Sequence, residues 1–434
     1  MEQQHLKTVA RQIKQLFLET RLNEMGKDVG FCRRERDVTP YRLLVSVVGS
    51  LASGTVKTLA DLQRGFNALC ERDVQYKPFH NQLAKRQFPV YLQQVCETLM
   101  NRFTDSVLQV APDSPYARFE RLVIHDGTSF GVKSGLKRVF PGRFTTLKPA
   151  AVELHAGYDV LGESLEYVTL TADTEAEVHQ VPEPASLTGC LWLADRMFFM
   201  KEYLYELIEQ GGDFIVKTKG TLNPAVEQAY CGDGKEIKTW RGKSLQEVRH
   251  RFRREQPLDL VVSWRLSKKR TLAVRLIVTW DTEKKCPRYL ATSLPREDFS
   301  LKDVIEGYRL RWQIELLFKE WKSYANLHSF DTNNPHIAEG LIWASLCAAL
   351  LKRYYARVTQ WLFAVPISTQ RVAMCAHHVL ADVLYALLHA PTTLLAQIER
   401  ALTYLAHNAQ RAHPKRDRKK GRLKLGLQPV LTNP

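Results

Sequence analysis

Both ends of the chain have the hydrophobic spacing of helices. Up to about residue 110, segments such as YRLLVSVVGSLA (41–52) and FPVYLQQVCETLM (88–100) repeat apolar residues every three to four positions between polar turns. A similar pattern runs from 334 to about 408. The sequence therefore predicts helical regions over 1–115 and 331–410.

Near residue 119 the pattern changes to short apolar runs bounded by Gly, Pro, Asp and Ser. TADTEAEVHQ (171–180) and FFMKEYLYELIEQ (198–210) indicate helices. The strands we expect are RLVIHD, TSFGVK, AVELHAGYDV, SLEYVTLT, LWLAD and DFIVKT. Three strands, a helix, a strand, a helix and a further strand predict a mixed α/β sheet. This is the element order of the ribonuclease-H-like fold, which we predict for 116–219 together with 295–330.

Between these two stretches, residues 220–294 are strand-rich and predict a β-rich insertion, with IKTWRG, LDLVVSWRL, LAVRLIVTWD and RYLATSL as strands. After it we expect one helix from 301 to 324, with Ser300 as N-cap and Asp303 as its capping-box partner. The insertion also carries a basic cluster, which is either a phosphate-binding surface or a solvated helix face: Arg249, His250, Arg251, Arg253 and Arg254 around Phe252.

Charge adds a polyanionic partner to this picture. The 434 residues carry 62 Lys and Arg against 46 Asp and Glu, a formal net charge of +16, which suits a protein that neutralises phosphates. The basic residues of 1–115 predict a DNA-binding region, the alternative being a helical cap with solvated charges. The tail 411–434, which contains HPKRDRKKGRLKLG, is predicted to be disordered until it meets nucleic acid.

The eight cysteines and the apolar segments bear on the compartment. No C-x-x-C pair or Cys/His knuckle occurs, so we expect reduced, mostly buried thiols. The opening MEQQHLKTVARQIKQ lacks the apolar core of a signal peptide. The longest uncharged apolar stretch, 341–351, is too short to span a bilayer and predicts a core helix. We expect a cytoplasmic protein without membrane contact.

Candidate chemistry lies on the predicted helix 301–324. Tyr308, Arg311, Glu315 and Lys322 follow the spacing Y-x2-R-x3-E-x6-K. At about 100° per residue, these four side chains fall within roughly a 60° arc. The carboxylate can ligate a metal, while the hydroxyl and the two cations hold phosphate oxygens. The alternative is a surface helix with i,i+4 ion pairs such as Arg311 with Glu315.

Two aspartates extend this site. Asp126 closes the apolar run LVIHD and Asp195 closes LWLAD, so both carboxylates are expected at strand ends, where open α/β sheets place their sites. A single strand-end Asp is usually a turn former. Two of them with Glu315 suit Mg²⁺, which takes oxygen ligands. His125 points to the opposite face of its strand and is predicted to be structural.

The Y-x2-R-x3-E-x6-K spacing, with HDGTSF around the first Asp and LWLADR around the second, resembles the DDE transposases of bacterial insertion sequences. The likeness is to family four, which has a Y-R-E-K signature, and it covers roughly residues 119–325. It implies that Asp126, Asp195 and Glu315 form the acidic triad and hold two Mg²⁺ ions, for which Mn²⁺ can substitute. It also implies contacts from Tyr308, Arg311 and Lys322 to the backbone of the transposon end.

The resemblance further implies cut-and-paste excision and integration. Each transposon end is nicked, the freed 3′-hydroxyl makes a hairpin, and the opened end is transferred into target DNA. The implied partners are the terminal inverted repeats and the target, bound by a homodimer that is nucleoid-associated when on DNA. In relatives an insertion-domain Trp stacks on a flipped base. In this sequence Tyr289 occupies the corresponding position, on the strand just before the catalytic helix. Trp240, Trp264 and Trp280 are the alternative candidates for base stacking.

Three other functions fit parts of the sequence. A catalytically silent DNA-binding protein derived from a transposase is the main alternative, and binding without cutting distinguishes it. A phosphotyrosine recombinase using Tyr308 needs several Arg and His around the Tyr and gains nothing from an acidic triad. A sugar hydrolase with paired carboxylates leaves the net charge and the basic tail without a purpose.

Overall fold

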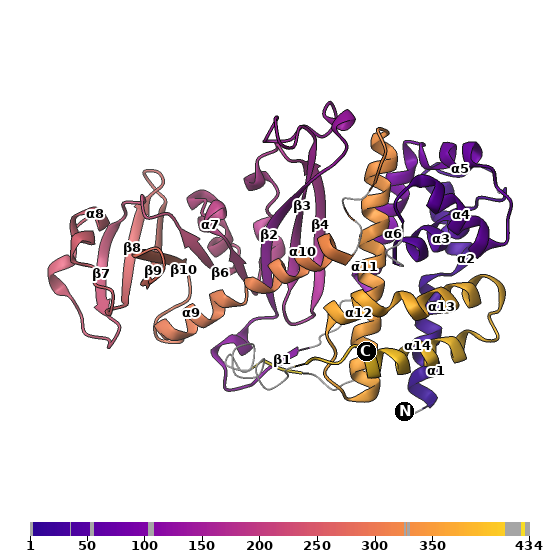
Figure 1. The fold of residues 1–434 in the computed structure, drawn as a ribbon. Coiled ribbons are helices and arrows are strands. Elements are labelled where there is room, and N and C mark those ends of the chain that lie inside the picture. Colours follow the sequence, from indigo (N-terminus) through magenta and orange to yellow (C-terminus); the bar gives the residue numbers. More distant parts are fainter. Residues whose placement is uncertain are drawn as a thin grey trace.

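The sheet and most of the helices occupy different parts of the molecule. The computed structural model describes residues 3–34, 36–52, 56–102, 108–324, 327, 330–412 and 427–429. Figure 1 shows the strands on one side and the N-terminal and C-terminal helices together on the other, with the long helix α11 (Pro335–Phe363) between them.

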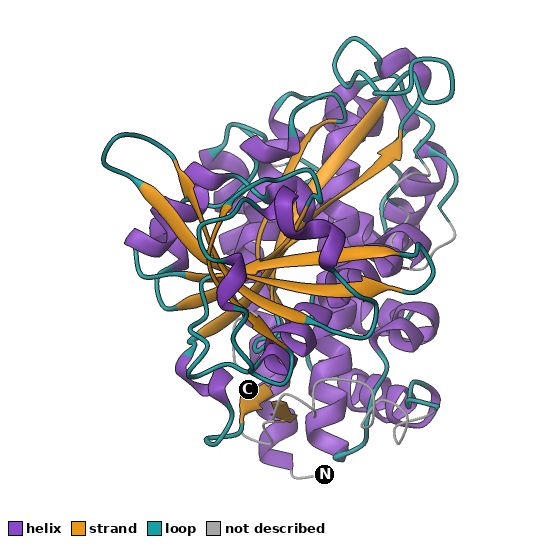
Figure 2. Cartoon of the chain, turned by 90° about the vertical axis from the view of Figure 1, so that its left-hand side faces the viewer, coloured by secondary structure: helices purple, strands orange, loops and turns teal. Residues whose placement is uncertain are grey.

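Nine strands of the described chain form one mixed sheet. β2 is parallel to β5 and β5 to β6, and the other neighbours are antiparallel. Figure 2 shows the strands fanning across one another, as the twist of a large sheet requires. The order across the sheet is β4 (Ser164–Ala172), β3 (Ala151–Asp159), β2 (Arg121–Gly131), β5 (Cys190–Ala194), β6 (Asp213–Thr218), β10 (Cys286–Thr292), β9 (Thr271–Asp281), β8 (Leu258–Arg265) and β7 (Ala225–Cys231).

The five strands β2 to β6 confirm the predicted ribonuclease-H-like order. An antiparallel meander of β2, β3 and β4 is followed by β5 and β6, which are added in parallel on the other side of β2. β5 is buried at every position, because a central strand with parallel neighbours is covered on both faces. RLVIHD and the TSFG part of TSFGVK, predicted as two strands, belong to the single strand β2, and Val132 and Lys133 follow its end. The strands of 220–294 continue the same sheet through the pairing of β10 with β6.

Two segments differ from the predictions. The segment 171–180, predicted as a helix, is the end of β4 followed by a short 3₁₀ turn at Glu177–His179. Asp173 explains this, because its carboxylate accepts a hydrogen bond from the backbone of Arg143 and fixes the chain in a turn. IKTWRG, predicted as a strand, contains a 3₁₀ turn at Lys238–Trp240. β7 was not predicted, because only two of its seven positions are buried and its alternation is weak.

Helices occupy the described residues on both sides of the sheet in the sequence. Before the sheet lie α1 (Gln3–Leu16), α2 (Glu19–Asp28), α3 (Pro40–Ala52), α4 (Leu59–Cys70), α5 (Tyr76–Leu83) and α6 (Gln87–Arg102). After it lie α11, α12 (Thr369–Cys375), α13 (His377–His389) and α14 (Leu394–Asn408). Two further helices lie among the strands, α7 (Lys201–Glu209) and the short α8 (Leu245–Val248).

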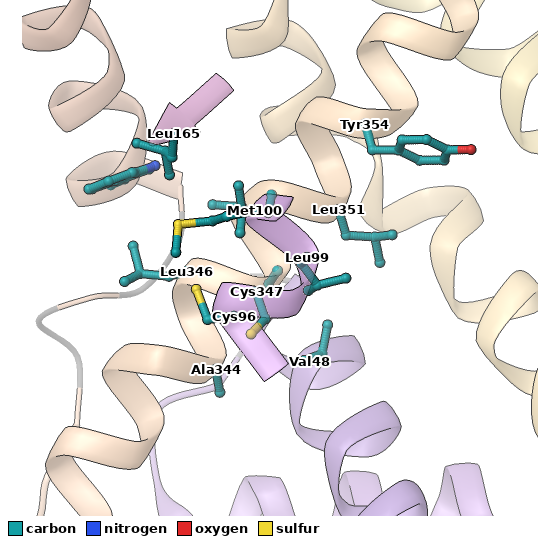
Figure 3. Packing of buried hydrophobic residues seen from close by; sticks show 14 of the residues in the cluster. Val48, Cys96, Leu99, Met100, Leu165, Ala344, Leu346, Cys347, Leu351 and Tyr354 are labelled. Atoms are coloured by element: carbon teal, nitrogen blue, oxygen red, sulfur yellow. The ribbon is translucent and has the colours of Figure 1, made fainter. Parts of the chain in front are cut away.

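Helix α11 holds the helical part together. Figure 3 shows Leu346, Cys347 and Leu351 of α11 packed against Leu99 and Met100 of α6. Every side chain from 341 to 351 is buried, which confirms the predicted core helix. Among the described residues no single helix has the length and apolar content of a membrane span, and only the bent pair α12 and α13 meets that test together.

The helix predicted over 301–324 is broken into two. α9 (Leu301–Arg309) ends in a tight turn, in which the backbone N–H of Leu310 bonds to Gly307 and that of Arg311 to Tyr308, and α10 (Trp312–Tyr324) follows. Such i→i+3 bonding in the middle of a helix is 3₁₀ geometry. The predicted capping box is confirmed, because Ser300 accepts from the backbone of Asp303 at 3.2 Å.

A short segment near the C-terminus pairs with the short strand that precedes β2 in the chain. β11 (Leu427–Pro429) pairs with β1 (Leu108–Val110) in a separate antiparallel ribbon. Apart from these three residues and 411–412, the predicted disordered tail 411–434 lies outside the described residues.

Candidate active site

The sheet places two of the predicted carboxylates on neighbouring strands. His125 of β2 and Ala194 of β5 are the last pair in the parallel ladder, and Asp126 and Asp195 are the residues that follow. Here β5 ends and the chain turns into a 3₁₀ turn at Arg196–Phe198. The two carboxylates therefore lie on neighbouring strands where the β2–β5 pairing stops. Asp195 follows the end of β5 as predicted, but the predicted strand end at Asp126 is wrong, because β2 continues to Gly131 in its pairing with β3.

The turn between α9 and α10 brings the third carboxylate to the first two. The Arg311 guanidinium donates to Oδ2 of Asp126 at 2.8 Å and also to Oε1 of Glu315. The Tyr308 hydroxyl lies 3.4 Å from Oδ1 of Asp195. Five of the predicted site residues thus meet in one cluster, in which a single cation lies between two carboxylates.

Burial controls the charges of this cluster. It raises the pKa of Asp126 from 3.8 to about 6, against the opposing effect of Arg311, and the neighbouring Asp195 and Glu315 carboxylates add to the rise. Burial also raises the pKa of Tyr308, so its hydroxyl stays protonated. Burial opposes the charge of Arg311, but Tyr308 and the two carboxylates outweigh it and raise the pKa of the guanidinium.

Lys322 approaches the sheet from the far end of α10. Its Nζ donates to the backbone carbonyl of Ser129 at 2.9 Å, three residues beyond Asp126 on β2. Burial lowers its pKa, and the charge of Lys148 lowers it further. The structure therefore places Lys322 beside the strand that carries Asp126, and its hydrogen bond is to the strand backbone.

His125 lies on the opposite face of β2 from Asp126, as the alternation of a strand predicted. It is fully buried, and its Nδ1 is 2.6 Å from the Tyr167 hydroxyl. Burial lowers its pKa to about 3, so the ring is neutral and packs against Phe198. These contacts agree with a structural role.

The predicted base-stacking residue is covered. Tyr289 of β10 is 4% exposed, and its ring lies 6.4 Å from that of Phe252 and 6.0 Å from the Arg249 guanidinium. Two of its competitors, Trp240 and Trp264, are buried in the same core, and Trp280 is half-buried.

An exposed aromatic residue that the sequence did not indicate lies at the start of α10. Trp312 is 57% exposed and directly follows Arg311. Its exposure could have been predicted from the helix pattern, because a residue one step from Arg311 points about 100° away from the face shared by the motif.

The donor set fits a hard divalent cation in its chemistry. Three carboxylates converge here, and carboxylate oxygens are the ligands that Mg²⁺ takes. Asp126 and Glu315 already surround a cation, the Arg311 guanidinium. Within the described ranges no group of three His, Cys, Asp or Glu side chains is arranged at metal-binding distances. Metal binding by Asp126 and Glu315 would require these carboxylates to give up their bonds to Arg311.

Comparisons with known proteins give the class of the chain. Residues 117–351 match the family described as "Transposase DDE domain". The match spans more than half of the 434 residues, and the chain belongs to this family.

Individual relatives are insertion-sequence transposases. The transposase for insertion sequence element IS1151 of Clostridium perfringens is 23% identical over 359 residues, which are 73% of this chain and 74% of the relative. The transposase for IS231C of Bacillus thuringiensis subsp. berliner is 20% identical over 435 residues, covering 90% and 89%. A solved piggyBac transposase synaptic complex with hairpin DNA covers 93% of this chain and 86% of its own, at 10% identity. Its TM-score of 0.48 is too low to support a conclusion.

Proposed function

We propose that this chain is a transposase of insertion sequence family four that excises and integrates its element by cutting and rejoining DNA phosphodiesters. One observation carries the proposal: carboxylates from β2, from the end of β5 and from α10 converge around Arg311 and Tyr308. The order of these residues along the chain matches the Y-R-E-K spacing.

Asp126, Asp195 and Glu315 would hold two Mg²⁺ ions, or Mn²⁺ in their place. When bound, the metal supplies an activated water or 3′-hydroxyl and stabilises the leaving oxygen of an in-line displacement. Arg311 then releases the carboxylates with which it now pairs. We expect its guanidinium to hold a phosphate oxygen instead, for which its planar set of donors is suited.

The remaining motif residues position the DNA strand. Tyr308 donates a hydrogen bond to a phosphate oxygen, and its raised pKa supports a donor rather than a nucleophile. Lys322 provides a second cation on the path of the strand. Tyr289 stacks on a flipped base of the hairpin intermediate. Because it is 4% exposed, the segment carrying Arg249 and Phe252 must first move away.

The other regions recognise the DNA. We propose that 1–115 binds the terminal inverted repeats and that the catalytic domain consists of 116–219 and 295–330, with 220–294 as its insertion. The helical region 331–410 and the basic tail 411–434 complete the chain. Cutting two ends together requires two active sites, and we propose a homodimer assembled on the DNA, which also captures the target.

Cleavage of a plasmid carrying the sequences that flank the gene tests this function. The wild type should nick it in Mg²⁺, whereas Asp126→Asn, Asp195→Asn and Glu315→Gln should each lose nicking but still bind the ends. Glu202→Gln, an exposed acid on α7, is the matched control and should nick normally. A wild type that binds the ends and never cuts them in Mg²⁺ or Mn²⁺ would support the silent DNA-binding alternative.

A further inference from the structure

The connection between β2 and β3, residues 132–149, is a purely basic segment in its charged residues. It contains five basic residues and no Asp or Glu. We call this segment the β2–β3 loop. It begins at the end of β2, the strand that carries Asp126.

The base of the loop is firmly attached. Leu136 and Phe140 are 2% and 6% exposed and belong to the main hydrophobic core. Lys133 forms an ion pair with Asp331. The Asn333 side chain also lies against the loop, since a β-carbon at Gly135 would come 2.2 Å from its Oδ1.

The second half of the loop is fixed by Arg143. Its backbone N–H donates to Asp173 at 2.8 Å, and its guanidinium donates to Glu177 at 2.7 Å and pairs with Glu153. Beyond it, the backbone N–H of Lys148 closes the tip by donating to the carbonyl of Phe144 at 2.7 Å. The tip, Phe144–Lys148, is therefore a turn on a rigid support.

The tip carries apolar side chains that are exposed among the described residues. Leu147 is 85% exposed and Phe144 is 63% exposed, the two largest values among the bulky apolar residues that the structure describes. Val139, on the same loop, is 51% exposed. Exposed bulky apolar side chains that are gathered on one element mark a contact surface. The neighbouring Lys137, Arg138 and Lys148 are all cationic, which indicates that this surface meets a polyanionic partner.

The position of the tip relative to the site follows from β2. Gly131 lies five residue steps after Asp126, which at about 3.3 Å per step is roughly 17 Å along β2. The stem of Lys148 lies over Gly131, 3.9 Å from the position of an added β-carbon, and its charge acts on Lys322. The tip is thus within about one helical turn of duplex DNA, ~34 Å, from the triad.

We propose that the β2–β3 loop deforms DNA: its cations hold the phosphate backbone, while Phe144 and Leu147 enter between base pairs within one turn of the cleaved phosphate. The inference rests on the proposed function and goes beyond it. Apolar side chains that enter a base step unstack and kink the duplex, and flanking cations keep the backbone in place. A second copy of this chain is a poorer partner, because both surfaces carry the same excess of positive charge.

Binding without cleavage tests the proposal. The probes are two labelled duplexes of about three helical turns, one fully paired and one with a mismatched centre, in EDTA. Unstacking is cheaper at the mismatch, so the wild type should bind that duplex about tenfold more tightly. F144S/L147S should lose this preference, and the matched control Met374→Ser, which changes an exposed Met on α12, should keep it. K137A/R138A should weaken both duplexes equally and reduce the salt slope by roughly two.

Each outcome decides one point. A wild type that binds neither duplex overturns the proposed function as well. A wild type that binds both equally, or an F144S/L147S variant that keeps the preference, overturns the DNA-deforming loop alone. Loss of a dimer in F144S/L147S, with the preference intact, would assign the tip to a contact between copies and also overturn the proposal. Unchanged thermal melting of the variants excludes a folding defect, because the altered side chains are exposed.

Discussion

Replacing Asp126 with Asn should stabilise the metal-free protein above pH 7. Burial raises the pKa of Asp126 from 3.8 to about 6, so the folded protein binds this proton more tightly than the unfolded chain does. The resulting stability is fully present below about pH 4 and is lost as the pH rises through 6. The shift corresponds to about 3 kcal/mol. Asn keeps the side chain neutral at every pH and avoids this loss.

Urea unfolding in EDTA across this pH range measures the effect. Above pH 7 the free energy of unfolding of Asp126→Asn should exceed that of the wild type by up to about 3 kcal/mol, and the two should converge near pH 4. Glu153, whose pKa burial raises to about 7, titrates in both proteins and largely cancels. A variant that is less stable than the wild type above pH 7 would refute the reasoning, because the ion pair with Arg311 would then outweigh the cost of burial.

Three further predictions concern neighbouring contacts. Arg353→Met leaves Glu320, whose side chain is 7% exposed, without its partner, and should lower the free energy of unfolding by about 3–5 kcal/mol. Adding Glu320→Gln should restore part of this in urea titrations, and no recovery would contradict the pairing. Ser300→Ala removes the cap of α9 and should cost about 1 kcal/mol by the same assay; no loss would make the cap irrelevant. Lys322→Ala should reduce the salt slope of DNA binding by about one, and an unchanged slope would remove Lys322 from the phosphate contacts.

Much of the fold could be predicted because burial leaves a direct pattern in the sequence. LWLAD is apolar throughout because β5 is covered on both faces, and 341–351 is apolar because α11 is the centre of the helical part. The helix prediction for 171–180 was wrong because the turn in this segment depends on a hydrogen bond between Asp173 and Arg143, two residues that are distant in sequence. The break between α9 and α10 could not be predicted from a helix-breaking residue, because positions 310 and 311 are Leu and Arg rather than Gly or Pro.

The candidate site was predictable in its members but not in its contacts. The spacing of Tyr308, Arg311 and Glu315 named three members, but the turn between α9 and α10, which the sequence did not predict, brings them to the two aspartates. The pairing of Arg311 with Asp126 joins residues 185 positions apart, which no local pattern contains. The covering of Tyr289 and the exposure of Trp312 likewise depend on tertiary packing. The catalytic and DNA-binding roles of these residues stay predictions.

A change of metal preference tests the central claim most directly, namely that the three carboxylates form one metal-dependent cutting centre. In Glu315→Cys a thiolate replaces the carboxylate, and a thiolate binds a softer transition-metal ion better than it binds Mg²⁺. The account predicts that this variant nicks end-bearing DNA in Mn²⁺ and not in Mg²⁺, while the wild type nicks in both. Equal loss of nicking in the two metals, with normal binding to the ends, would contradict a role for Glu315 as a metal ligand.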